Sequence, residues 1–541
     1  MSAPLTPDSP AAPGATPQWR RLDPRTLLVH CGWMMAPFGS LALTALATGG
    51  RITLEAWITL AAMAASFAVL TAIGLIRWAR TDFRITDDSF EVRSGLLNRR
   101  LRSVPLHRIR TVDLTATPFH RLLGVTVLRA GTAGSGDRGN ELSLEALKVA
   151  EADRLRAELL ARAHTGTAAE DPVLARINWR WLRYAPLTFW VIGGVFVVAG
   201  AAYRALDGIG IEPWKIGFVQ RAFHEFGTSM LWLTVPAALL AVLALGSVGA
   251  VVLYVENWWN YCLEWTDAHT LGVRRGLLTT RSVTIERARL RGVLVREPLL
   301  LRAGGGALVR AVAGGLGNRE ENRRRSGLMP PAPRREALRV ASGALQSPFP
   351  ATELTPGATQ RPLTPHPKVA LRRRRMRGLL FVVLPATAVL AALGAVLAAF
   401  GAAFTPVLLH CAWLCAAVGA AAVEWLARDA YRSLGHGLRG RYLVIRSGTF
   451  SRDTLALQRE AIAAWTFSTS PFTRRAGLVT LTAAVAAGED GYRLPDLAAA
   501  DAPALAATAA PGILEEFLVH PGTVHPGTTP SGETTQRLRS R

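Results

Sequence analysis

Six apolar segments, arranged in three pairs, set the strongest limit on what this chain can fold into. The first pair covers residues 27–49 and 52–76, the second covers 185–202 and 229–255, and the third covers 378–403 and 405–426. A helix of about 20 apolar residues crosses the roughly 30 Å of hydrocarbon in a membrane. We therefore predict an α-helical integral membrane protein with six transmembrane helices in three pairs.

The positive charge of the chain gives these helices a direction. Half of the 541 residues are hydrophobic, yet the formal net charge is +23, so the basic residues must lie outside the apolar segments. Arginines gather at one end of each pair: Arg20, Arg21, Arg25, Arg77, Arg80 and Arg84 at the first, Arg176, Arg180 and Arg183 at the second, and Arg372, Arg373, Arg374, Arg375, Arg377, Arg428 and Arg432 at the third. Basic flanks favour the cytoplasmic side. We expect a multi-pass protein of the cell membrane with both termini and the regions after each pair in the cytoplasm.

The three regions that follow the pairs of segments are copies of one sequence pattern. The copies align on Gly95, Gly276 and Gly448, within Val92-Arg93-Ser94-Gly95-Leu96-Leu97, Val273-Arg274-Arg275-Gly276-Leu277-Leu278 and Ile445-Arg446-Ser447-Gly448-Thr449-Phe450. Apolar residues then recur at matching distances from each glycine: Val104, Ile285 and Leu457, then Ile109, Leu290 and Ile462, then Val112, Val293 and Trp465. A proline with an apolar neighbour follows in each copy, at Pro118, Pro298 and Pro471. We therefore expect three copies of one fold.

Each copy has the pattern of short antiparallel strands followed by a helix. Apolar and strand-forming residues lie on both sides of the aligned glycine, which supplies the positive φ of a hairpin turn. Gly95, Gly276 and Gly448 are thus predicted to be structural turn residues. Helical spacing runs from Leu147 to Leu155 in the first copy and, more weakly, from residue 497 to 505 in the third. About five to seven strands closed by one helix fit a small barrel or roll.

The motifs of the first copy resemble a known family. They are the turn at Gly95, the strand Val104-Pro105-Leu106-His107-Arg108-Ile109, the bend Thr117-Pro118-Phe119-His120-Arg121 and the closing Glu151-Ala152-Asp153-Arg154-Leu155. Together they look like the bacterial pleckstrin-homology (PH) domain of polytopic membrane proteins. The resemblance implies three cytoplasmic PH-like β-barrel or roll domains, each capped by a helix, and no known chemistry. The second copy is degenerate, with Gly304-Gly305-Gly306 in place of the bend and no clear closing helix.

These patterns divide the chain into membrane pairs, PH-like domains and connecting segments. The predicted order is a disordered tail (1–26), the first transmembrane pair (27–76), PH-like domain 1 (80–164), a linker (165–184), the second pair (185–255), the degenerate PH-like domain 2 (258–345), a basic Pro-rich linker (346–377), the third pair (378–427), PH-like domain 3 (436–520) and a disordered tail (521–541). The stretch 314–368 is rich in Pro, Arg, Gly, Ser and Thr, so we interpret it as a flexible linker or an insertion into the second copy.

The sequence offers little catalytic or metal-binding chemistry. Cys411 and Cys415 stand one helical turn apart beside His410, but membrane helices also use cysteine as a small apolar residue, so no metal is predicted. Glu424 lies near the end of its segment with Arg428 four residues later, which is the order of a helical ion pair. No serine elbow, phosphate loop or metalloprotease helix is present, so we expect no enzyme activity and no cofactor.

The strongest functional signal is a basic surface on the first copy. Arg99, Arg100, Arg102, Arg108 and Arg110 crowd a domain tethered beside the membrane, where contact with anionic lipid contributes about 1 kcal/mol per basic residue. The alternative is an ordinary solvated face. Nucleic acid is not expected, because the charge follows the membrane flanks without interleaved aromatic residues.

Two classes of function remain open. The first is a non-enzymatic scaffold or accessory factor whose modules bind lipid headgroups, peptides, other membrane proteins or one another at the cell envelope. The second is a transporter or membrane enzyme for a lipid-like substrate, with the modules as regulators. A charged residue in the middle of a span would favour the second class, and the sequence places none there.

Overall fold

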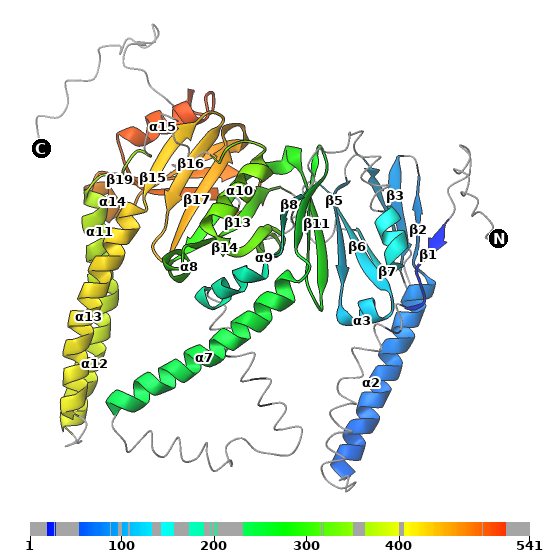
Figure 1. The fold of residues 1–541 in the computed structure, drawn as a ribbon, viewed down its shortest axis with the longest axis horizontal. Helices are drawn as coiled ribbons and strands as arrows, with labels where there is room; N and C mark the ends of the chain where they lie inside the picture. Colours follow the sequence, from blue (N-terminus) through cyan, green and yellow to red (C-terminus); the bar gives the residue numbers. More distant parts are fainter. Residues whose placement is uncertain are drawn as a thin grey trace, which may run out of the picture.

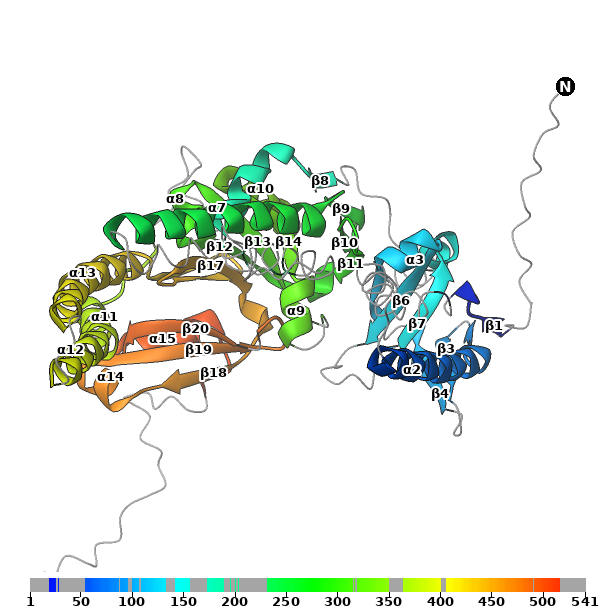
Figure 2. The same ribbon diagram turned by 90° about the horizontal axis from the view of Figure 1, so that it is seen from below.

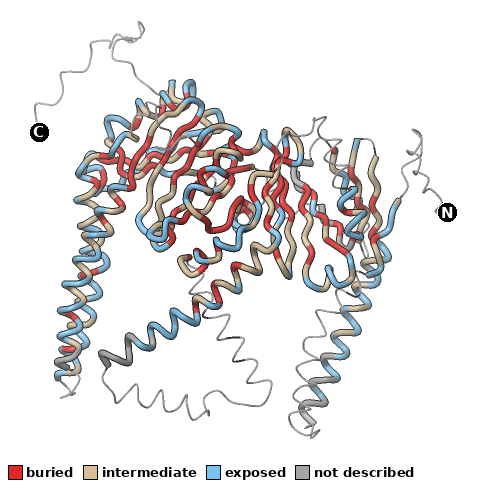
Figure 3. Tube along the Cα trace, viewed as in Figure 1, coloured by how far each residue is buried: buried red, intermediate tan, exposed pale blue. Residues whose placement is uncertain are grey.

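Three folded domains stand in a row, and long helices extend from one side of that row (Figure 1). The computed structural model describes residues 19–25, 54–86, 88–95, 100–106, 109–132, 142–155, 173–188, 231–314, 319–349, 363–399, 405–489 and 491–515, together with residues 28, 195, 200, 203 and 316. The predicted first and third transmembrane segments, 27–49 and 185–202, lie largely outside these residues. The buried residues gather in the three domains, whereas the extended helices are mostly exposed (Figure 3).

Each domain consists of two antiparallel sheets. In domain 1 the first sheet holds β2 (Asp82–Ile85), β3 (Ser89–Ser94) and β4 (Arg100–Pro105), and the second holds β5 (Ile109–Ala116), β6 (Val125–Thr132) and β7 (Leu142–Lys148). Domain 2 repeats this order with β9 (Cys262–Asp267), β10 (Thr270–Arg275), β11 (Thr280–Glu286), β12 (Leu290–Pro298), β13 (Gly306–Ala313) and β14 (Gly327–Pro333). Domain 3 repeats it with β15 (Gly435–Arg439), β16 (Tyr442–Ser447), β17 (Ser451–Gln458), β18 (Ile462–Ser468), β19 (Leu478–Val485) and β20 (Gly491–Ala498).

Short helices occupy equivalent places in the three domains. The predicted proline bend is a five-residue helix in each copy: α3 (Pro118–Leu122), α8 (Leu299–Ala303) and α14 (Pro471–Arg475). A closing helix follows the last strand, at residues 149–155 in domain 1, as α10 (Arg334–Leu345) in domain 2 and as α15 (Asp501–Ala509) in domain 3. Two of these helices begin later than predicted, because Leu147 and Leu497 belong to strands and are buried in the domain cores.

The expectation for the second copy was wrong. It has a closing helix, α10, whose buried face includes Ala337, Leu338 and Ala341, and α9 (Arg319–Arg325) and β14 also lie in the stretch interpreted as a linker or insertion. The prolines of β14 caused the error. This strand is at the edge of its sheet, where a residue without an N–H group loses no ladder bond, so a proline-rich strand is tolerated.

A strand before each membrane pair completes the first sheet of the domain that follows the pair. β1 (Arg20–Arg21) pairs with β2, β8 (Val173–Arg176) pairs with β9, and Thr364 forms a bridge with His436 of β15. The predicted tail 1–26 and the predicted linkers 165–184 and 346–377 therefore contribute to the folded domains. The membrane segments are inserted between the first and second strands of each PH-like fold.

Three of the described helices are long and apolar enough to cross a membrane. Their apolar stretches are Leu239–Trp258 in α7 (Leu231–Trp258), Val369–Ala399, which joins α11 (Val369–Gly378) through a π-helical turn (Leu379–Val383) to α12 (Leu384–Ala399), and Leu408–Arg432 in α13 (Thr405–Arg432). Helix α2 (Leu54–Ala79) contains a shorter apolar stretch, Ala64–Ile76. The count of six spans in three pairs remains a prediction.

The three domains are joined through their sheets. β5 of domain 1 pairs with β11 of domain 2, and β12 of domain 2 pairs with β17 of domain 3, both antiparallel. The resulting sheets have the orders β7-β6-β5-β11-β10-β9-β8 and β14-β13-β12-β17-β16-β15. The second sheet of each domain thus continues into the first sheet of the next, and the row is held by backbone hydrogen bonds.

The sheet pairing leads to a topology prediction. Because β1 with β2, β8 with β9 and Thr364 with His436 hold both ends of each insert at one sheet, each insert must cross the membrane an even number of times. A reporter fused after Arg84, Arg274 or Arg446 is expected to report the cytoplasm, and one at Glu212 the outside. An external signal from one or two of the three domains would contradict the even count, and an external signal from all three would contradict the orientation.

Candidate arginine cavity at the membrane side of domain 2

A cavity of about 640 Å³ lies between helix α7 and the sheets of domain 2, with domain 3 closing one end. Seen from below, α7 passes along β12, β13 and β14 (Figure 2). Six arginines from five elements line the cavity: Arg275 of β10, Arg281 of β11, Arg296 of β12, Arg310 of β13, and Arg323 and Arg324 of α9. No aspartate or glutamate is among the residues that line it. The cavity is therefore strongly basic.

The opposite wall of the cavity is largely apolar. It comes from the last turns of α7, which contribute Ala250, Leu253, Tyr254 and Trp258, and from Phe450 at the turn of domain 3. Further along α7, away from the domain, apolar side chains such as Leu239, Leu240 and Val248 are exposed, as expected of a helix that faces lipid. The cavity thus joins a basic surface to the end of a membrane helix.

Arg275 shows how the arginines are held. Its guanidinium lies 4.3 Å from the centre of the Trp258 ring and donates a hydrogen bond of 2.6 Å to the carbonyl oxygen of Arg324. Burial, with a smaller contribution from the neighbouring Arg281, lowers the pKa of Arg275 to about 10. A guanidinium with a lowered pKa is one whose positive charge is poorly compensated, although it stays charged at neutral pH.

Other arginines of the cavity are in the same condition. Burial lowers the pKa of Arg310, and the charge of Arg296 lowers it further. Burial also lowers the pKa of Arg281, with a smaller contribution from the charge of Arg324. Arg296 has a carboxylate partner in Asp453, at 3.4 Å, and Arg324 has one in Glu320, at 2.5 Å.

Three of the other cavity guanidiniums have no such partner among the described residues. In the part of the chain that the structure describes, no ion pair joins Arg275, Arg281 or Arg310 to a carboxylate. An anion bound among these three would therefore restore charge balance.

The arginines predicted to contact lipid belong to domain 1, at one end of the row, and not to the cavity. Arg102 is exposed on β4, Arg100 lies on β4 and Arg110 on β5, with no side-chain position described for the latter two, and Arg99 and Arg108 fall outside the described residues. The lipid patch on domain 1 remains a prediction. The cavity arginines were missed because they come from five elements spread over some 50 residues, and in a chain so rich in arginine their spacing carries no signal.

The turn glycines have the backbone that a hairpin of this shape needs. Gly95, Gly276 and Gly448 have φ values of 139°, 113° and 138°. An ideal Cβ would lie 2.0 Å from the Thr279 carbonyl oxygen at Gly276, and 1.6 Å from the Ser451 carbonyl oxygen at Gly448. Either distance excludes a side chain.

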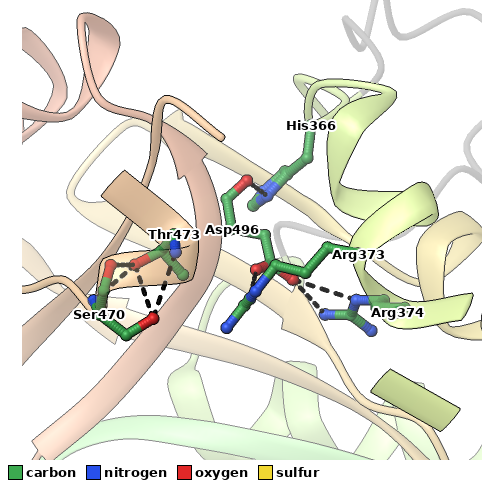
Figure 4. Close-up of polar contacts among 6 residues, drawn as sticks. All are labelled: His366, Arg373, Arg374, Ser470, Thr473 and Asp496. Atoms are coloured by element: carbon green, nitrogen blue, oxygen red, sulfur yellow. Dashed lines mark hydrogen bonds and ion pairs between the residues drawn. The ribbon is translucent and has the colours of Figure 1, made fainter. Parts of the chain in front are cut away.

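A second polar cluster fixes the third membrane pair to domain 3 (Figure 4). Asp496 of β20 is 2% exposed and accepts from Arg373 and from Arg374, the latter at 3.1 Å, and both arginines belong to α11. The ring Nδ1 of His366 lies 3.1 Å from the Asp496 carbonyl oxygen. In the same view, Ser470 and Thr473 form the capping box of α14. The basic run that precedes the apolar part of this pair is thus a helix, α11, bound to domain 3.

The remaining candidates from the sequence have ordinary surroundings. Glu424 pairs with Arg428 at 2.7 Å, as predicted, and also with Arg375 of α11 at 2.7 Å. Cys411 and Cys415 are free thiols on α13. Among the described residues, no three His, Cys, Asp or Glu side chains are grouped so that they could hold a metal ion.

Comparison with known proteins agrees with this architecture. Residues 38–163 and 379–511, just under half of the chain, match the bacterial PH domain family, and this match in two regions supports a membrane protein with repeated bacterial PH domains. Over 280 residues the chain is 24% identical to the UPF0699 transmembrane protein YdbT of Bacillus subtilis (strain 168). The aligned region covers 48% of this chain and 55% of that protein. The chain thus spans about half the length of this curated relative. No solved structure matches the chain.

Proposed function

We propose that this protein is a non-enzymatic membrane scaffold whose row of PH-like domains binds the phosphate headgroup of an anionic lipid in the arginine cavity. The observation that carries the proposal is the composition of the cavity: six arginines, no carboxylate and one apolar wall supplied by a membrane helix. A guanidinium binds phosphate through paired N–H donors, and several around one anion hold it from more than one side.

The membrane helix favours a lipid over a free phosphate ion. Ala250, Leu253 and Tyr254 at the end of α7 would contact the glycerol and the first methylene groups of an acyl chain, while the guanidiniums hold the phosphate. The volume of about 640 Å³ suits a headgroup, because ligand sites in proteins usually have roughly 300–1,000 Å³. The row of domains supports the scaffold role, because continuous sheets join the domains into one extended surface.

Among the described residues, no observation specifically favours an enzyme or a transporter. The Ser451 hydroxyl in the cavity donates to Asp453 at 2.5 Å and accepts from Arg296 at 3.2 Å, so it serves the contact between domains. Within the described spans, Glu424 lies near the domain end of α13 and is paired with arginines on both sides. We therefore propose that binding, and not turnover, is what the protein does.

Removing two cavity charges is expected to weaken lipid binding at least tenfold. The double variant Arg275→Gln with Arg310→Gln keeps polar, unbranched side chains but removes two charged contacts to phosphate, each contributing about 1 kcal/mol or more. Binding is measured on the full chain in nanodiscs of phosphatidylcholine with increasing phosphatidylglycerol, by native mass spectrometry of the retained lipid. Arg335→Gln on the exposed side of α10 is the matched control and should bind like the parent chain.

The same measurement separates the possible sources of the anion. Inorganic phosphate and glycerol phosphate at millimolar concentration should not displace the lipid, since they lack the part that contacts α7. Displacement by either would mean that the site takes a free phosphate. Equal retention of phosphatidylcholine and phosphatidylglycerol, unchanged in the double variant, would refute the lipid site.

A further inference from the structure

We infer that copies of this protein join head to tail in the membrane, with β18 of one copy pairing with β4 of the next. This inference is independent of the lipid site and rests on the way in which the three domains are already joined. At the first internal junction, β5, which begins the second sheet of domain 1, pairs with β11 in the first sheet of domain 2. At the second, β12, which begins the second sheet of domain 2, pairs with β17 in the first sheet of domain 3. The chain contains three domains but only two such junctions, so one strand of each kind is left at the ends of the row.

The two internal junctions have the same register. Leu114, nineteen residues after Gly95, lies opposite Ser282, six residues after Gly276. Val295, nineteen residues after Gly276, lies opposite Thr454, six residues after Gly448. The short helix after the first strand adds a second contact at each junction, through Arg121 to the carbonyl oxygen of Leu277 and through the N–H of Leu299 to that of Phe450, the latter at 2.8 Å. Because the two junctions share one register, the way in which neighbouring domains pair is a property of the PH-like domain itself.

The strands at the ends of the row are open. Among the described residues, β4 pairs only with β3 and β18 only with β19, and the two strands lie at opposite ends of the row (Figure 2). Four of the seven β12 residues that face a partner in the junction with β17 are buried, whereas most of β18 is exposed. Proteins usually protect an edge strand with charges, proline or a bulge. β18, with the sequence Ile-Ala-Ala-Trp-Thr-Phe-Ser, has no charged residue and no proline, and its register shift against β19 lies at its start, between Ile462 and Ala464. β4 does carry Arg100, Arg102 and Pro105, but the internal junction strand β12 also contains charged residues and a proline and is nevertheless paired.

Applying the internal register to the free strands brings exposed apolar residues together. Nineteen residues after Gly448 is Phe467, and six residues after Gly95 is Leu101. Phe467 is 40% exposed and Leu101 is 55% exposed, whereas Val295 at the equivalent place in the second junction is 2% exposed. In the same register Trp465, whose indole N–H is buried without a hydrogen-bond partner in the described structure, lies opposite Ser103. The free edges therefore have the complementarity of an unfilled junction.

The partner that fits is a second copy of this chain. β4 and β18 of one copy do not meet, since they lie in domains at opposite ends of a row that continuous sheets join. The described helices extend from one side of all three domains, so adding a copy with the same junction geometry keeps its helices on the membrane side (Figure 1). The contact is heterologous, and repetition in the plane of the membrane gives a ring or an open arc.

Cysteine cross-linking between two tagged copies tests this inference. In full-length chains freed of their four native cysteines, one copy carries Phe467→Cys and the other Leu101→Cys, and mild oxidation is done in native membranes. Directly opposite residues in an antiparallel pair have Cα atoms about 4.5–5.5 Å apart, within the range of a disulfide. We expect a product that carries both tags, and a ladder of larger products when one chain carries both substitutions.

Two controls make the outcome decisive. Val295→Cys with Thr454→Cys must form a disulfide within one chain, which shows that the oxidation works on a known junction. Ala464→Cys with Leu101→Cys is out of register and should cross-link at least fivefold less. The inference is overturned if the internal control forms while the mixed product does not, or if the main products join Phe467→Cys to itself or Leu101→Cys to itself.

Discussion

Replacing Gly448 with valine is expected to unfold the hairpin of β16 and β17 and to open the junction between domains 2 and 3. At φ of 138° a residue with a Cβ is strained, and here the Cβ would also lie 1.6 Å from the carbonyl oxygen of Ser451, a backbone atom that cannot move without breaking the turn. Strain and overlap together should cost roughly 3 kcal/mol or more of local stability. Hydrogen exchange of the full chain should show loss of protection in β17 and in its partner β12.

The control for this variant is another glycine of the same domain. Gly440 has φ of 54°, and a Cβ built on it has no neighbouring atom within 4 Å. Gly440→Ala should therefore cost only about 1 kcal/mol, the usual difference for a left-handed residue. Equal loss of protection in the two variants would mean that the close approach at Gly448 is not what makes glycine necessary.

The repeat was predictable from the sequence because its signals are local. A glycine with positive φ and the apolar residues on either side of it fix a hairpin within about ten residues. The apolar residues fourteen positions after each glycine, Ile109, Leu290 and Ile462, are the first residues of β5, β12 and β18. Positions set by a turn and a strand period can be read without knowing what lies across the sheet.

The strands that precede the membrane pairs could not be predicted in this way. β1 is two residues long, and its partner β2 begins 61 residues later in the chain. Nothing in Arg20 and Arg21 distinguishes a strand from a basic flank, because the pattern that defines the strand lies in its distant partner. The same holds for Thr364, whose bridge to His436 spans the whole third pair.

The arginine cavity could not be predicted from the sequence for a similar reason, because its residues come together only in the fold. Arginine is common in every part of the chain outside the apolar segments, so only the fold shows which arginines converge. The domain whose sequence has diverged most from the repeat is the one that brings them together, with α9 adding Arg323 and Arg324 in a stretch that reads as a linker. The arginines thus converge in the domain whose repeat pattern is weakest.

Replacing Asp496 with alanine is expected to release helix α11 from domain 3. The Asp496 carboxylate is buried and is shared by two guanidiniums, those of Arg373 and Arg374, which are 21% and 16% exposed. Removing one member of a buried ionic group leaves the others without compensation, which typically costs about 3–5 kcal/mol. In hydrogen exchange of the full chain, residues 369–377 should lose protection, whereas the helix from Leu384 onward should keep it.

Asparagine at the same position separates charge from backbone. Asp496 has φ of 61°, a conformation that asparagine adopts as readily as aspartate but that strains alanine. Asp496→Asn keeps the backbone and one acceptor oxygen but removes the negative charge, so it should lose an intermediate amount of protection in residues 369–377. If the asparagine variant behaves like the parent chain and only alanine releases the helix, the backbone conformation and the remaining acceptor oxygen hold α11 in place without the charge. If both variants release it, the charge does, and the basic run before the third membrane pair is anchored by one carboxylate.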